Sequence, residues 1–185
     1  MRATWLPNPD LWRMAPGSEC PKLVRMIVEI GRNSSNKYEF DRDLGLFRLD
    51  RALYSPVHYP GDYGFIPGTI AEDGDPIDVL AVVEQPSFPG CLIDVRPIAV
   101  LDLVDETESD HKIIAVPKDA PRFDQIRSME DLAPHLRDEI EHFFTLYKEL
   151  EGKIVKARGW RGLEEAREAI AASRQRFLDT SACRY

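Results

Sequence analysis

The chain is poor in cysteine, and it lacks long apolar runs. Its three cysteines, Cys20, Cys91 and Cys183, are far apart and form no Cys-x-x-Cys pair. This spacing predicts neither a disulfide framework nor a structural zinc site. No apolar run is long enough to span a bilayer, and the first residues lack the continuous apolar core of a signal peptide. We therefore expect a cytoplasmic protein with no membrane partner.

Several common catalytic motifs are also missing. The sequence has no G-x-x-x-x-G-K-[ST] loop and no G-x-G-x-x-G turn, which disfavours an ordinary nucleoside-triphosphate or dinucleotide site. It has no G-x-S-x-G elbow of a serine hydrolase. The four histidines (His58, His111, His135 and His142) are scattered without metal-ligand spacing. The chemistry must depend on other residue types.

Acidic residues outnumber basic ones in this chain. The formal net charge is -8, with 43% hydrophobic and 30% charged residues over 185 positions. This composition is that of a globular protein, and the acidic balance argues against nucleic acid as the main partner. The length suits one domain. We assign residues 23–185 to that domain and residues 1–22 to an N-terminal arm whose Trp5 and Trp12 pack on the body or on another subunit, or are disordered.

The hydrophobic pattern changes from strands to helices along the chain. Alternation predicts strands over residues 23–30, 37–41, 45–51, 77–84, 92–106, 111–117 and 152–160, with a break at Pro97. Residues 54–76, dense in Pro, Gly and Tyr, read as a long functional loop. Apolar spacings of three and four predict helices from Pro134 to Leu150 and from Leu163 to Phe177. The order indicates an α+β fold, a small closed β-barrel flanked by two main C-terminal helices.

Two acidic clusters are candidates for cation binding. In "EDGDPIDVL", residues 72–80, Gly74 and Pro76 impose turn geometry on Asp73 and Asp75, so these carboxylates and Asp78 can converge. "DETESDHK", residues 105–112, adds Asp105 and Asp110. Oxygen ligands of this kind suit magnesium, although either cluster alone is more often a solvated turn.

Basic and aromatic residues complete the constellation. Lys37 and Glu39 share a strand face, and Arg51 ends the next predicted strand. Tyr147 and Lys148 close the apolar stripe of the first helix. Carboxylates for divalent ions together with lysine, arginine and tyrosine donors describe a site for a phosphate ester or a polyphosphate.

These motifs resemble those of the soluble family I inorganic pyrophosphatases. The resemblance is based on "EDGDPIDVL" and on the order of "VEIGRNSSNKYEFD", "LDR", "HYPGDYGFIPGT", "VLDLVDETESDHKIIAVP" and "HFFTLYKELE", over roughly residues 24–176. It implies an OB-like barrel and the hydrolysis of pyrophosphate by a water that Mg²⁺ activates. Mn²⁺ and Zn²⁺ are possible substitutes. It also implies a homo-oligomer, with a hexamer favoured.

The resemblance further implies a role for each matching residue. Asp75 would be the general base. Asp73, Asp78 and Asp110 would bind the first ion, with Asp78 bridging to a second. The remaining ions would be held by Asp105, Glu39 and, through water, Glu29. The phosphates would be gripped by Lys37, Arg51, Tyr63, Lys112, Tyr147 and Lys148, with Tyr59 lining the site.

Three other interpretations compete with this one. A phosphohydrolase for short polyphosphates or nucleotides would use the same groups, but no base-binding pocket is evident. An OB-like nucleic-acid binder fits the barrel but not the acidic clusters. A calcium-stabilised structural module explains the acidic loops but not Lys37, Arg51 and Lys148. Turnover that depends on magnesium would separate the enzyme from the last two.

Overall fold

The computed structural model describes residues 8–106 and 108–182. Trp5 and Cys183 lie outside this range, and Cys20 and Cys91 are free thiols. The strands are β1 Val24–Ile30, β2 Asn36–Asp41, β3 Leu46–Ala52, β4 Asp62–Phe65, β5 Asp78–Ala81, β6 Leu92–Asp105, β7 Glu108–Pro117 and β8 Val155–Arg161. The helices are α1 Pro134–Leu146 and α2 Leu163–Ala182, with short 3-10 turns η1 Leu11–Arg13, η2 Pro121–Phe123, η3 Met129–Asp131 and η4 Glu149–Glu151.

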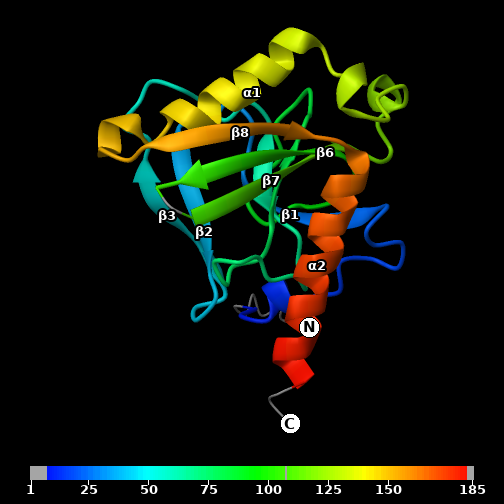
Figure 1. Ribbon diagram of the computed structural model, residues 1–185. Coiled ribbons are helices and arrows are strands. Elements are labelled where there is room, and N and C mark those ends of the chain that lie inside the picture. The colour runs from blue at the N-terminus through cyan, green and yellow to red at the C-terminus, as the bar shows by residue number, and fades with distance from the viewer. Residues whose placement is uncertain (1–7, 107, 183–185) are drawn as a thin grey trace, which may run out of the picture.

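The strands form one mixed sheet and one separate ribbon (Figure 1). The order in the six-stranded sheet is β1-β4-β5-β7-β6-β8, and β6 also pairs with β1, so that β1, β4, β5, β7 and β6 form a ring of hydrogen-bonded strands. Strands β2 and β3 pair only with each other among the described residues. The structure thus confirms a mixed sheet with two main helices, while the OB-like closed barrel stays a prediction.

Both helices bury the faces that the spacing predicts. Helix α1 lies above β8 in Figure 1 and buries Ile140, Phe143 and Phe144. Helix α2 runs beside β6 and β7 and places Ala166 and Ile170 in a second buried cluster. No helix in the described ranges is long and apolar enough to cross a membrane.

The predicted loop over residues 54–76 was partly wrong, because it contains β4. The strand pairs with β1 on one side and β5 on the other, and its residues are all buried. Gly64 lies within β4 and contributes no side chain, so the alternation of apolar residues did not indicate a strand there. A Cβ on Gly64 would overlap the carbonyl oxygen of Ile27, so only glycine lets the two backbones approach this closely.

The helix ends also differ from the predicted ones. Helix α1 ends at Leu146, and the predicted continuation to Leu150 is a turn followed by η4. Helix α2 continues past Phe177 to Ala182. A hydrogen bond of 2.8 Å from the Gln175 amide to the Asp179 carboxylate supports this added turn. The added turn is polar, so the sequence has no apolar stripe there from which its extent could be predicted.

The described part of the N-terminal arm packs on the body. The Gly68 amide donates to the Trp12 carbonyl at 2.7 Å, and the Arg25 amide donates to the Pro16 carbonyl at 2.7 Å. The Trp12 ring meets Phe177 edge to face, with centroids 5.8 Å apart. The arm is therefore fixed between the Gly68 turn and the last turns of α2.

We expect Gly64→Ala to destabilise the fold by about 1 to 3 kcal/mol, because the added methyl group must push β1 and β4 apart. Urea unfolding followed by circular dichroism measures the loss. Gly162→Ala is the matched control, since its Cβ would meet only the end of the Glu165 side chain, at 3.3 Å. Equal stability of the two variants would contradict the role assigned to Gly64.

Candidate functional site

The register between β5 and β7 sets the centre of the site. These strands run parallel, and Asp78 lies opposite Lys112. Asp110, two residues before Lys112, faces the same side. The Lys112 ammonium forms ion pairs with Asp78 and with Asp110, the latter at 2.7 Å, and the side chain is only 4% exposed. One buried cation thus holds two of the predicted metal ligands together.

The acidic turn before β5 adds Asp73 and Asp75. Gly74 adopts a positive φ of 89°, which a side chain would strain. The Asp75 amide donates to the Asp73 carboxylate at 2.9 Å, and the Ala71 amide donates to the Asp75 carbonyl at 2.6 Å. The turn therefore presents both carboxylates toward the pocket that Asp78 lines.

The β2–β3 ribbon supplies the opposite wall. Lys37 and Glu39 form an ion pair on the strand face they share. The carboxylate of Glu29, on β1, accepts a hydrogen bond from the Phe40 amide at 2.8 Å. A side chain, not a sheet ladder, thus joins the ribbon to the main sheet next to the site.

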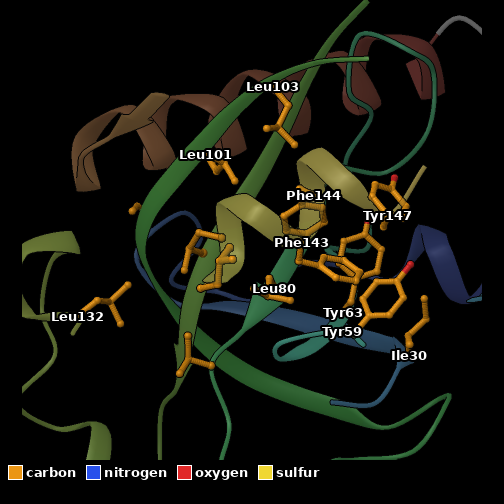
Figure 2. Close-up of a cluster of buried hydrophobic side chains, with 14 of the residues drawn as sticks. Ile30, Tyr59, Tyr63, Leu80, Leu101, Leu103, Leu132, Phe143, Phe144 and Tyr147 are labelled. Carbon is orange, nitrogen blue, oxygen red and sulfur yellow. The ribbon is translucent and has the colours of Figure 1, made fainter. Parts of the chain in front are cut away.

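Tyr63 of β4 and Tyr147, directly after α1, add aromatic side chains to the lining of the pocket. Figure 2 shows Tyr63, Phe143, Phe144 and Tyr147 gathered at one end of the buried cluster. The Tyr147 ring stacks on Phe143, with centroids 5.3 Å apart. The Lys112 ammonium donates to the Tyr63 hydroxyl at 3.2 Å. These contacts fix the phenol rings of Tyr63 and Tyr147 beside the charged groups of the pocket.

A single pocket of about 320 Å³ collects most of the predicted residues. It is lined by Glu29, Lys37, Glu39, Tyr63, Asp73, Asp75, Asp78, Asp105, Asp110, Lys112, Tyr147 and Lys148. Lys148 reaches it by an ion pair with Asp105 from the end of β6. Residues far apart in the sequence thus share one cavity.

Two predicted residues do not line this pocket. Arg51 lies opposite Lys37 in the ribbon, but its guanidinium pairs with Glu151 at 2.7 Å and also with Asp50. Tyr59 is 1% exposed and packs behind Tyr63, with ring centroids 5.3 Å apart. Neither the strand position of Arg51 nor the loop position of Tyr59 was enough to place the side chain, because each depends on the neighbours that it contacts.

Among the lining residues that were not predicted from the sequence, Arg42 and Trp12 lie beside the acidic turn. Arg42 follows β2 and pairs with Asp75, and Trp12 of the N-terminal arm lies under the Arg42 guanidinium, 4.6 Å from its ring centroid. No motif marks either residue. A tryptophan in a proline-rich arm was the only available signal, and it did not indicate where the arm docks.

Crowding shifts the pKa values at the site. Burial, together with Asp78 and Glu39, raises the pKa of Glu29 to about 8 despite the hydrogen bond from Phe40. Burial lowers the pKa of Lys112, but Asp78 and Asp110 outweigh burial, so the pKa is raised well above its usual range. Burial therefore favours the neutral form of Glu29, whereas the two carboxylates beside Lys112 favour its charged form.

These features fit a hard divalent cation. No group of three acidic, histidine or cysteine side chains within the described residues is arranged to hold an ion directly. However, the donors are carboxylates, which magnesium and its relatives prefer. Asp105 also keeps one buried carboxylate oxygen without a hydrogen-bond partner in the described part of the chain. An added cation would serve that oxygen and relieve the crowding at Glu29.

Known proteins resemble this chain in sequence and in fold. A sequence profile described as inorganic pyrophosphatase matches residues 26–178. An inorganic pyrophosphatase of Nostoc is 46% identical over 164 residues, which is 89% of this chain and 96% of the relative. One from Geobacillus stearothermophilus is 50% identical over 149 residues, 80% and 90% of the two chains. The crystal structure of inorganic pyrophosphatase from Thermus thermophilus matches with a TM-score of 0.89 at 42% identity, over 91% of this chain and 99% of that one.

We expect the raised pKa of Glu29 to make the metal-free protein less stable as pH rises. The folded state disfavours the ionised carboxylate, so no stability is lost below the unfolded pKa, near 4.5. The loss grows between pH 4.5 and about 8 and is complete above that range. With chelator present at pH 8.5, Glu29→Gln should exceed the wild type in unfolding free energy by roughly 1 to 3 kcal/mol.

Urea unfolding at pH 5 and pH 8.5 measures this difference. Glu168→Gln, at an exposed position of α2, is the matched control and should follow the wild type at both pH values. If Glu29→Gln shows the same pH dependence as the wild type, the carboxylate is not held in its neutral form.

Proposed function

The chain belongs to the inorganic pyrophosphatase family, and we propose that it hydrolyses pyrophosphate to two phosphates with Mg²⁺ as the metal and Asp75 as the general base. The observation that carries the proposal is the pocket in which carboxylates and lysines from both sheets meet Lys148 from the turn after α1. Acidic groups bind the cations, and basic groups bind the phosphates that those cations accompany.

A bound divalent ion makes a water molecule more acidic and offsets the charge of the phosphates. On this proposal Asp73, Asp78 and Asp110 hold the first ion. Asp105, Glu39 and Glu29 complete the set of acidic groups for the others. The unpartnered oxygen of Asp105 supports this assignment.

Asp75 suits a proton acceptor because it lies at the rim of the pocket. Its side chain is 72% exposed, so water can reach it. Partial loss of hydration raises the pKa of Asp75; Arg42 opposes this shift, and Asp73 and Asp78 add to it. A carboxylate with a raised pKa accepts a proton from an attacking water more readily than an ordinary one.

The lysines and tyrosines supply donors for the phosphates. Lys37, Lys112 and Lys148 are now paired with carboxylates, and cations on those carboxylates would free the ammonium groups for phosphate oxygens. Burial and Asp78 raise the pKa of Tyr63 well above its usual range, so its hydroxyl remains a donor. Tyr147, which lines the same pocket, would be a second donor to a phosphate oxygen. Arg51 would join only by leaving Glu151.

The first test of the function is phosphate release from pyrophosphate by the purified protein. We expect fast release with magnesium and none with excess chelator. Tripolyphosphate and ATP, assayed in parallel, should be much poorer substrates. Equal turnover of ATP would favour the broader phosphohydrolase, and no release with any divalent metal would refute hydrolysis.

We expect Asp75→Asn to lower kcat by about 100-fold or more, because the amide keeps the shape of the side chain but cannot accept the proton. Steady-state kinetics with circular dichroism as a folding check measure the effect. Glu72→Gln, an exposed change in the same turn, is the control and should keep the wild-type rate. Turnover of Asp75→Asn near the control would remove Asp75 from the role of base.

Lys148→Ala should raise KM for pyrophosphate by roughly tenfold, since a charged hydrogen bond to the substrate is lost. The affinity for magnesium, measured by calorimetry, should weaken far less. Lys153→Ala, at an exposed position nearby, is the control. An unchanged steady-state profile would return Lys148 to a purely structural pairing with Asp105.

A further inference from the structure

The proposed base has a single side-chain partner. Asp75 lies on an exposed turn, and within the described residues only Arg42 pairs with its carboxylate. An aspartate side chain with this exposure can turn about two bonds in solution. A base must face the proton that it accepts, so whatever restrains this carboxylate affects the reaction.

Arg42 is itself held on two sides. Its guanidinium lies over the Trp12 ring, 4.6 Å from the ring centroid, and it reaches the Gly74 carbonyl at 3.5 Å. The side chain is 33% exposed, less than half the exposure of its partner Asp75. The flat guanidinium suits this arrangement, because one of its faces can stack on the indole while an edge bonds the carboxylate.

Trp12 is fixed by contacts that do not involve Arg42. Its carbonyl accepts the Gly68 amide at 2.7 Å, and its ring meets Phe177 of α2 edge to face. Gly68 has a positive φ of 68°, and a Cβ there would meet the Met14 carbonyl at 2.7 Å, so the arm passes close to this turn. The indole is therefore a fixed support for the guanidinium.

We propose that Arg42 is a positioning residue that orients Asp75, and that Trp12 of the N-terminal arm supports Arg42 in this role. The inference rests on the proposed function, since it concerns the base of that reaction. It makes Trp12, which precedes the matched family region beginning at residue 26, part of the active site. Neither residue is required to touch the substrate.

The kinetic test compares four single variants. Arg42→Ala and Trp12→Leu should each lower kcat roughly tenfold, as for a misplaced catalytic group, while KM changes less than twofold. Arg42→Lys should fall between, because it keeps the charge but loses the flat stacking face. Arg13→Ala is the matched control and should leave kcat unchanged, since it removes a second cation from the same ring, at 5.1 Å, without contacting Asp75.

The double variant Trp12→Leu/Arg42→Ala tests whether Trp12 acts through Arg42 or affects the active site independently of it. If Trp12 acts through Arg42, the double variant should be no slower than Arg42→Ala alone. Multiplied losses would overturn the support role. A rise in KM at constant kcat in Arg42→Ala would make Arg42 a substrate-binding group and overturn the positioning role.

A second measurement needs no activity. In a protein whose only tryptophan is Trp12, made by Trp5→Phe and Trp160→Phe, removal of the Arg42 guanidinium should increase acrylamide quenching at least twofold. An unchanged quenching constant would show that the stacking is absent and would overturn the inference. An inactive wild type would refute the proposed function together with this inference, whereas an active wild type with unaffected variants would refute the inference alone.

Discussion

The parallel pairing of β5 with β7 is the constraint on which the site depends. It sets Asp78 opposite Lys112 and brings Asp110 to the same face, so that one buried ammonium stands between two carboxylates. That ammonium offsets the repulsion between the two half-buried carboxylates. Lys112 is almost fully buried because the strand register and the neighbouring aromatic side chains exclude water from its ammonium group. The two carboxylates keep that ammonium group charged.

Each half of the site balances charge in the same way. Lys37 pairs with Glu39, Lys148 pairs with Asp105 and Arg42 pairs with Asp75. Glu29 forms no ion pair among the described residues, and burial raises its pKa to about 8. On the proposed function, divalent ions would replace these basic side chains as the partners of the carboxylates. Metal and substrate together can replace these pairs without leaving a buried charge alone. An acidic pocket can therefore accept an anionic substrate when cations enter with it.

Much of the fold and of the site followed from local patterns. Alternation found most strands, and the three-and-four spacing found both helices, because each segment buries one face. The acidic turn was predicted because Gly74 and Pro76 dictate its geometry. By contrast, β4 was missed because Gly64 contributes no side chain to the pattern, and Arg51 was placed by strand position although Glu151, a hundred residues later, receives it. Arg42 and Trp12 meet only after the arm docks, which no local pattern encodes.

The division of the site between two sheets has a consequence for how it tolerates change. The β2–β3 ribbon and the larger sheet share no ladder pairing in the part of the chain described. The Phe40 amide donates to the Glu29 carboxylate, and the Phe40 ring packs on Phe65 with centroids 6.1 Å apart. Side chains therefore set the width of the pocket. A substitution under the ribbon would alter the spacing between its two walls while every strand kept its register, so the reaction would be more sensitive to such a change than the fold.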